Sequence, residues 1–420
     1  MPFSTPAPAG RTADDDCRAL TPGGTSLALF SLALGGAALG TAEFASMGVL
    51  PGVAASLRVP ESTAGLLISA YALGVVIGAP VISVLGARMR RRSLLLVMTA
   101  LVVLSNSGSA LAPDFPALAA TRFVAGLPHG AYLGVAALAA ASLVPDERRG
   151  RAIASVFLGL TVANVAGVPL STAIGQYWGW RATFALVAVV ALASVLAVRL
   201  FVPVLPRGRN GRLTREMRAL GNGQFWMAVA TCVVGFGGIF AVYTYISSTL
   251  TDVSGISNGW VPAVLSLFGV GMTVGTVVGG RLADRSVLGT ITAGLIAFAG
   301  LMAAFTVLVH HPVTAVVGVF LLGVLCMGAM PSMQARLLDV APDAPTLAAS
   351  IMHSATNTAN AIGAWAGGLV LSVGAGYAAI GWVGAGMAVG GVALAVTSGA
   401  LDRRSPAGGP LGRELNDVQV

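Results

Sequence analysis

Long apolar runs, separated by short polar stretches, cover most of this 420-residue chain. A helix needs about 20 predominantly apolar residues to cross the hydrocarbon core of a bilayer. We count twelve runs of roughly that length, at residues 26–50, 62–85, 93–112, 116–143, 150–173, 180–203, 224–248, 260–280, 287–309, 313–335, 345–371 and 376–400. The pattern therefore predicts an all-α polytopic membrane protein with twelve transmembrane helices.

Composition agrees with this prediction. Hydrophobic residues make up 56% of the chain and charged residues 10%, and the mean hydropathy is +0.85, whereas an ordinary soluble domain is about 25% charged. The 55 glycines also fit, because glycine lets transmembrane helices approach closely. Cys17, Cys232 and Cys326 are far apart and lack metal-ligand spacing, so we predict neither a disulfide framework nor a metal site.

The arginines indicate the orientation in the membrane. If the N-terminus is inside, every arginine except Arg58, Arg122 and Arg181 falls in a tail or an inner loop, and cytoplasmic loops carry an excess of basic residues. We therefore predict that both termini are cytoplasmic. The net charge of +8 is spread over short loops rather than gathered on a soluble surface, which argues against nucleic-acid binding. Residues 1–25 lack signal-peptide features and are predicted to be a disordered cytoplasmic tail. Residues 401–420 are predicted to be a second cytoplasmic tail.

The longest loop divides the predicted helices into two groups of six. Residues 204–223 are polar and arginine-rich. Two short stretches recur on either side of this loop, residues 144–146 at 341–343 with an offset of 197, and residues 163–167 at 359–363 with an offset of 196. We predict two pseudo-symmetric six-helix bundles, at 26–203 and 224–400, around a central pathway.

One acidic residue lies well inside a predicted span. Glu43 is near the outer end of the first run, and a charge inside the bilayer is costly, so such residues usually face the bundle interior and serve a function. Arg122, about six residues into the inward-running fourth span, lies at the same depth, roughly 10 Å below the outer surface. We predict a direct or water-bridged pair between them.

Arg122 also begins a motif. Arg122, Gly126 and Gly130 are spaced by four residues, which permits close helix packing, and the pattern resembles the Arg-x-x-x-Gly-x-x-x-Gly motif of proton-coupled members of the major facilitator superfamily. His129 lies seven positions after Arg122, on nearly the same helical face. Histidine titrates near neutrality and can relay protons; a hydrogen-bonded packing role is the alternative. The alternative for Arg122 is an anchor at the membrane interface.

A second motif closes the eighth span. Gly280, Asp284 and Arg285 fit the loop signature Gly-x-x-x-Asp-Arg, which resembles that of the same superfamily. The glycine would allow close helix approach, and the charged pair would gate the inner mouth. The corresponding first-half loop, which contains Arg88, keeps its arginines but has no Asp. The alternative is a cluster that only sets topology.

Further stretches extend the resemblance over residues 26–203. Gly159 and the Gly-Val-Pro at 167–169 resemble the exporter motif of the superfamily, in which proline bends the helix and glycines permit contact between the halves. The stretches that look like AraJ-type efflux proteins, which are twelve-span drug:proton antiporters, lie at 40–44, 50–51, 64–67, 71–74 and 179–184.

This resemblance implies a function. It implies a monomer of the bacterial cytoplasmic (inner) membrane that exports a small organic molecule, of the drug, sugar or nucleoside class, in exchange for protons. The proton gradient would take the place of any cofactor, and Glu43 would carry the proton. From their depth in the spans, the candidate substrate-binding residues are Tyr71, Asn164, Tyr243, Tyr245, His353 and Asn357. Interhelical hydrogen bonding is the alternative for the asparagines.

Other functions stay open at this point. Uptake by proton symport is an alternative within transport, and a transport-inactive membrane sensor is an alternative outside it. An enzyme is disfavoured, because the chain has no phosphate-binding loop, no metal-ligand cluster and no plausible nucleophile–base pair.

Overall fold

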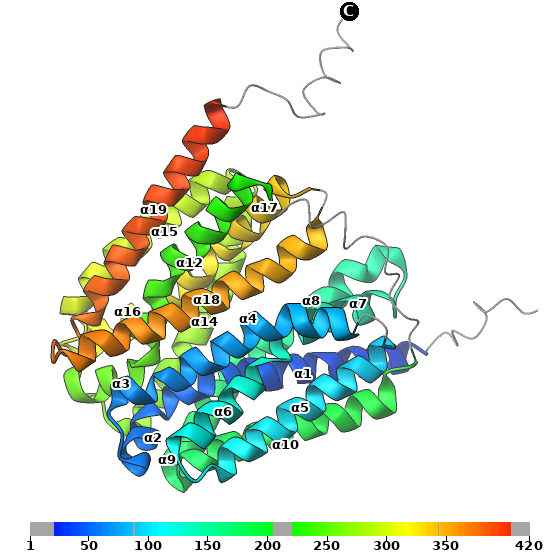
Figure 1. The fold of residues 1–420 in the computed structure, drawn as a ribbon, viewed down its shortest axis with the longest axis horizontal. Helices are drawn as coiled ribbons and strands as arrows, with labels where there is room; N and C mark the ends of the chain where they lie inside the picture. The colour runs from blue at the N-terminus through cyan, green and yellow to red at the C-terminus, as the bar shows by residue number, and fades with distance from the viewer. Residues whose placement is uncertain (1–20, 87–88, 205–220, 343, 405–420) are drawn as a thin grey trace, which may run out of the picture.

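The computed structural model describes residues 21–86, 89–204, 221–342 and 344–404, and all regular structure within them is helical (Figure 1). The first half contains α1 (Pro22–Gly48), α2 (Leu50–Leu57), α3 (Glu61–Ala64), α4 (Leu66–Gly86), α5 (Arg91–Leu111), α6 (Phe115–Gly126), α7 (His129–Ala141), η1 (Asp146–Arg148), α8 (Arg149–Val162), η2 (Ala163–Gly167), α9 (Val168–Trp178) and α10 (Trp180–Phe201). The second half contains α12 (Gly223–Thr244), α13 (Ile246–Ser248), η4 (Thr249–Val253), η5 (Asn258–Trp260), α14 (Val261–Ala283), α15 (Val287–Leu308), α16 (Pro312–Gly328), α17 (Met330–Val340), α18 (Pro345–Ser372) and α19 (Ile380–Arg404).

The helices extend into both predicted tails: α1 begins before residue 25, and α19 ends after residue 401. Thr21 caps α1 by accepting a hydrogen bond from the Gly24 amide, and Pro22 follows at the first helical position, a sequence that favours helix initiation. The first helix therefore starts a few residues before the predicted end of the tail at residue 25. At the other terminus, α19 continues to Arg404. The remaining tail residues and most of the predicted loop 204–223 lie outside the described residues.

The predicted spans correspond to helices. In the described part of the chain, eleven helices are long and apolar enough to cross a membrane. The remaining long helix, α18, has 28 residues but carries Thr356, Asn357, Thr358 and Asn360 in its middle. It packs against α12 of its own half and α4 of the other half. These neighbours shelter its polar side chains from lipid, where they would be costly.

The first and seventh spans break at related positions. Val49, between α1 and α2, has φ −112° and ψ 8°, and Tyr245, between α12 and α13, has φ −107° and ψ 18°. The two residues are 196 positions apart, which is the offset of the sequence repeat. Only the first break is followed by a proline, Pro51. The shared geometry therefore belongs to the repeat rather than to one residue type.

Equivalent helix contacts also recur in the two halves. A β-carbon on Gly167 would collide with the Thr41 side chain, and one on Gly363 would collide with the backbone oxygen of Gly237. Thr41 and Gly237, like Gly167 and Gly363, are 196 positions apart. The fifth span thus approaches the first in the same way as the eleventh approaches the seventh, as expected for pseudo-symmetric bundles.

The glycines of the fifth span do not join the halves, contrary to the expectation from the exporter-like motif. Gly159 packs against the backbone of Ala33 in α1, and Gly167 packs against Thr41, so both contacts lie within the first half. The π-helical turn η2 makes the contact between halves instead, because the backbone of Asn164 lies against Gly269 of α14. This turn ends at Gly167, two residues before Pro169, which cannot donate a backbone hydrogen bond.

Close helix packing at the end of the eighth span comes from a residue next to the predicted one. Around Gly280 there is open space for a β-carbon, so the expectation that this glycine permits close approach is wrong. A β-carbon on Gly279 would collide with the backbone oxygen of Gly328 in α16. Gly271 and Gly275 face the same helix in the same way.

The two halves are joined at one side of the bundle. We call this side outer, and the side where α1 begins and α19 ends inner, following the arginine distribution. Ser69 donates to the Ala361 oxygen at 2.9 Å and Ser247 donates to the Gly48 oxygen at 2.9 Å. Gln176 donates to both oxygens of Asn258, each at 2.9 Å. Figure 1 shows the halves together at the lower left and diverging toward the upper right. The outer side is therefore closed.

Two adjacent glycines allow a matched test of this packing. Gly279→Ala should lower the free energy of unfolding by about 1–3 kcal/mol, because the added methyl group meets backbone that cannot move aside. Gly280→Ala should cause no loss, since its β-carbon is free and alanine favours the helix. Thermal unfolding of the purified variants in detergent measures both. Equal stability of the two variants would contradict the close α14–α16 contact.

Candidate functional site

Glu43 lies at the centre of the molecule, where α1 meets helices of both halves. Its side chain is buried, and the residue is only 8% exposed. The Asn360 side chain, from α18 in the second half, lies beside the carboxylate, although neither of its polar atoms has a partner with hydrogen-bond geometry. A carboxylate in such a place is not fully compensated by its neighbours, so its charge state depends on what else enters the site.

His129 connects Glu43 to Tyr71. Nε2 of His129 lies 3.7 Å from Oε2 of Glu43, and Nδ1 lies 2.8 Å from the Tyr71 hydroxyl. The hydroxyl is also 3.4 Å from the backbone oxygen of Leu39, but it has a single proton, and the shorter contact is the stronger one. When the hydroxyl donates to Nδ1, the imidazole proton is on Nε2 and faces the carboxylate. The three side chains therefore lie in a chain whose Tyr71–His129 link is a hydrogen bond and whose His129–Glu43 link is an electrostatic contact at 3.7 Å.

Arg122 is fully buried beside this chain. Its Nη2 donates to the backbone oxygen of Ala42 at 2.7 Å, and its guanidinium carbon lies 4.4 Å from the centre of the Tyr71 ring and 5.4 Å from that of Phe184. Nε and Nη1 have no hydrogen-bond partner. The depth argument correctly places Arg122 next to Glu43, but the two side chains make no direct ion pair. Their charges interact across a short gap in a poorly solvated region.

Three buried asparagines have amide atoms without a hydrogen-bond partner. Asn164 and Asn357 each donate Nδ2 to the backbone oxygen four residues earlier and leave Oδ1 without a partner. Asn360, which is 0% exposed, leaves both amide atoms without a partner. A buried polar atom without a hydrogen bond costs about 1–3 kcal/mol. Such atoms mark a place where a ligand or water can bind.

The predicted substrate-binding residues separate into two groups. Tyr243 stacks on Phe268 with ring centres 4.0 Å apart and meets Phe44 edge-on at 6.0 Å, so it lies near Glu43 and the asparagines. His353 faces Gly130, the neighbour of His129, across the interface. Tyr245 lies elsewhere: its hydroxyl donates to the Ala364 oxygen and its ring fills the space left by Gly65. The structure places Tyr245 in the outer seam rather than in a central pocket.

The two predicted gate residues of the second half lie on the surface at the inner side. Asp284 and Arg285 are exposed, and neither forms an ion pair with a described residue. Asp284 does end α14, where its amide donates to the Gly280 oxygen at 3.2 Å. Arg88, the first-half candidate, lies outside the described residues. A charged latch between the halves would form only when this side closes.

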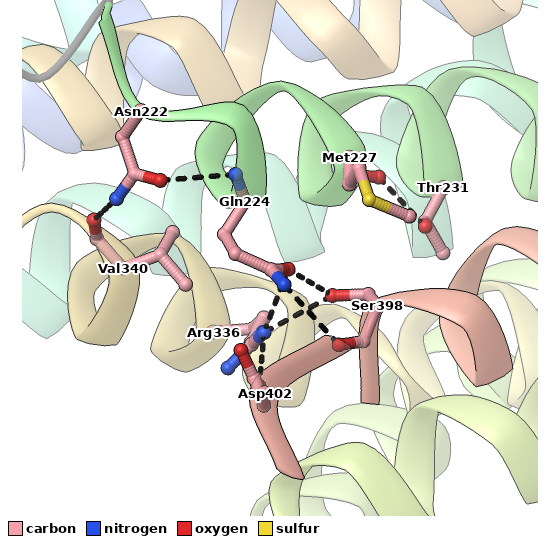
Figure 2. Close-up of polar contacts among 8 residues, drawn as sticks. All are labelled: Asn222, Gln224, Met227, Thr231, Arg336, Val340, Ser398 and Asp402. Carbon is pink, nitrogen blue, oxygen red and sulfur yellow. Dashed lines mark hydrogen bonds and ion pairs between the residues drawn. The ribbon is translucent and has the colours of Figure 1, made fainter. Parts of the chain in front are cut away.

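Sequence reasoning missed an inner cluster in the second half. Arg336 of α17 pairs with Asp402 of α19 at 2.6 Å and also contacts Gln224 of α12 and Ser398 of α19 (Figure 2). Asn222 caps α12 and donates to the Val340 oxygen at 2.7 Å. From the sequence, Arg336 is only one of the arginines that indicate the orientation in the membrane. Its partners come from two helices distant in sequence, α12 and α19, so the pattern of one span could not reveal them.

The twelve-helix fold and the buried charges between its halves define a class of membrane transporter with two bundles around a central site. Within the described residues, no three His, Cys, Asp or Glu side chains gather in a way that could hold a metal ion. Residues 32–364 match the model of the Major Facilitator Superfamily, and the chain belongs to this family. It is accordingly a transporter and not an enzyme.

Similar proteins support the efflux type. The chain is 38% identical over 357 residues to the inner membrane transport protein YdhP of Escherichia coli, covering 85% of this chain and 92% of YdhP. It is 36% identical over 359 residues to a chloramphenicol resistance protein of Streptomyces lividans, covering 84% and 90%. The resemblance to drug-efflux members of the superfamily, inferred from the motifs, is confirmed.

Solved structures support the fold. A point mutant of the nucleoside transporter NupG superposes with a TM-score of 0.75 at 12% identity, covering 89% of this chain and 99% of that one. Such low identity shows the shared architecture alone. The predicted arrangement of two six-helix bundles is confirmed.

The exposed motif residue at the inner side gives a test of gating. Asp284→Asn should slow transport several-fold without reducing membrane insertion, because it removes one charge of a latch and leaves the positive-inside signal unchanged. Transport rate per inserted molecule is the measurement. Asp339→Asn, at another exposed inner residue, is the control and should transport normally. Normal transport by Asp284→Asn would reduce the motif to a topology signal.

Proposed function

We propose that the chain exports a small organic molecule of the drug class in exchange for protons, with both termini in the cytoplasm. The observation that carries the proposal is the chain Glu43–His129–Tyr71, buried beside Arg122 at the junction of the halves. Similarity to a chloramphenicol resistance protein supports the drug class and the outward direction. Chloramphenicol is therefore the first substrate to test.

Coupling would arise from competition at Glu43. Asn360 lies beside the carboxylate and has two free amide atoms, so a substrate that binds Asn360 also occupies the space next to Glu43. Bound substrate would favour the ionised carboxylate if it donates a hydrogen bond to it. A proton would neutralise Glu43 and weaken that contact. The central site would then change from one side of the membrane to the other with either the proton or the substrate bound, which is the requirement for exchange.

His129 and Arg122 would serve this exchange differently. The imidazole bridges Glu43 and Tyr71, so it can move a proton to and from the carboxylate. The guanidinium offsets the negative charge when Glu43 is ionised, and it loses this partner when Glu43 is protonated. That change of local charge would alter the relative stability of the two access states.

The central test is Glu43→Gln in proteoliposomes loaded with labelled chloramphenicol. A one-unit pH gradient supplies about 1.4 kcal/mol per proton, enough for a roughly tenfold concentration ratio. The wild type should build up such a concentration ratio. Glu43→Gln should not concentrate the drug, but it should still exchange labelled for unlabelled drug. Accumulation against its gradient by Glu43→Gln would show that another residue couples the proton.

Two variants complete this test. His129→Gln should slow proton-driven accumulation but reach the wild-type ratio, because a relay changes a rate and not an equilibrium. Glu147→Gln, at an exposed position, should match the wild type. If the drug and the protons move across the membrane in the same direction, the protein is an uptake symporter. If neither the drug nor protons cross, it is a transport-inactive sensor.

Arg122 gives an independent prediction about stability. Arg122→Ala should abolish accumulation and lower the free energy of unfolding by about 3 kcal/mol, because it leaves a buried carboxylate without its nearby positive charge. In the Glu43→Gln background the same substitution should cost clearly less, since that carboxylate is absent. Thermal unfolding of the single and double variants in detergent measures the coupling. Additive losses would show that the two side chains do not interact.

A further inference from the structure

A single carboxylate joins the halves at the outer seam. Glu61 is the first residue of α3, in the first half. Its Oε2 accepts hydrogen bonds from the Ser248 hydroxyl at 2.6 Å and from the Tyr377 hydroxyl at 3.0 Å. Ser248 belongs to α13, and Tyr377 precedes α19, so both donors come from the second half.

Hydroxyl groups, rather than cations, balance this carboxylate. No described basic side chain forms an ion pair with Glu61, and Arg58, at the end of α2, makes none. The helices α4, α13 and α18, which lie nearby, carry no charged side chain at this end. Tyr245 and Asp252 are the other titratable groups within electrostatic range of the cluster. Asp252 is exposed and bonds Thr251 of its own half.

Tyr377 remains a hydrogen-bond donor over the whole physiological range. Burial, and next the negative charge of Glu61, raise the pKa of its phenol to about 12. The hydroxyl of serine does not titrate in this range either. The carboxyl group is thus the component of the cluster whose protonation can change when the outside becomes acidic.

We propose that Glu61 is a proton-sensitive latch of the outer gate, closed when the carboxylate is ionised and released when it is protonated from outside. An ionised acceptor makes hydrogen bonds about twice as strong as a neutral one. The closed state therefore gains stability at higher pH and loses it as the pH falls and the carboxyl group takes up a proton.

The rest of the seam does not share this property. Within the described ranges, Ser69, Ser247 and Gln176 make further cross-half hydrogen bonds, and these groups do not titrate. A pocket of about 640 Å³, lined by Gly48, Ser247 and Thr251 among others, lies at the same seam. A latch that opens toward the acidic side of the membrane would admit protons to Glu43 when they are abundant. This consequence rests on the proposed proton exchange; the latch itself needs only alternating access.

The test measures the opening of the outer side directly. Gly52 and Gly259 lie on opposite halves at this side, and both have open space for a side chain. We would replace the native cysteines and attach spin labels to cysteines introduced at these two positions. Pulsed electron paramagnetic resonance in lipid nanodiscs then measures the distance between the halves. Neither substrate nor a proton gradient is needed. The proposed latch can therefore be refuted without refuting proton exchange at Glu43, and proton exchange can be refuted without refuting the latch.

For the wild type we expect a short distance near pH 7.5 and a second, longer population near pH 5, because acidification favours the protonated carboxyl group. Glu61→Gln should raise the open-to-closed ratio roughly tenfold at the higher pH, since its neutral amide accepts weaker hydrogen bonds than the carboxylate, and should abolish the pH response. Tyr377→Phe, which removes one donor, should give a smaller increase. Tyr177→Phe, at an exposed outer tyrosine, should match the wild type.

Two results would overturn the latch. One is a Glu61→Gln distribution identical to that of the wild type at both pH values. The other is a pH response that persists in Glu61→Gln, which would assign the sensitivity to another group. If Glu61→Gln does not fold, Tyr377→Phe decides the question alone, because wild-type distances in that variant show that the bond does not hold the gate.

Discussion

Two opposite charges buried without direct contact impose the main constraint on this structure. Taking a carboxylate and a guanidinium out of water costs several kcal/mol each, and the centre of the molecule offsets this cost only in part. Arg122 has one backbone oxygen and two aromatic faces, while Glu43 has an imidazole at 3.7 Å and an amide that lies beside it unbonded. Each charge remains incompletely satisfied. A proton or a ligand can therefore shift the balance, which a fully paired salt bridge would resist.

The packing around this centre separates rigid parts from separable ones. Within each half, glycines bring helix backbones into direct contact, as Gly279 does against Gly328 and Gly363 against Gly237. The Arg336–Asp402 cluster further ties three helices of the second half together at the inner side (Figure 2). Between the halves, individual side-chain hydrogen bonds hold the outer seam, and the backbone of Asn164 lies against Gly269. Side-chain hydrogen bonds can be exchanged for water and a close contact can separate without deforming either helix, whereas the backbone packing inside a half is hard to deform, so the halves can move as units.

Much of the architecture could be predicted from the sequence because membrane insertion depends on local properties. Apolar runs of sufficient length, counted without any structure, correspond to the helices, and the repeat at an offset of 196 relates the breaks at Val49 and Tyr245. Depth along two helices correctly placed Arg122 beside Glu43. The same reasoning failed where orientation around a helix matters: it chose Gly280 instead of Gly279 for the close contact, and it assigned Tyr245 to a central pocket rather than to the outer seam.

The sequence by itself determined the twelve spans, the two related halves, the family and the pair of charges that must be buried together. Hydropathy, spacing and internal repetition are properties of continuous stretches of chain, so they can be obtained without knowing which helices touch. The tertiary structure alone decided which groups meet, because contacts such as Ser69 with Ala361, 292 residues apart, depend on how helices pack and not on local pattern. It placed His129 between Glu43 and Tyr71, left the Asn360 amide free, and set Glu61 against two hydroxyls of the opposite half.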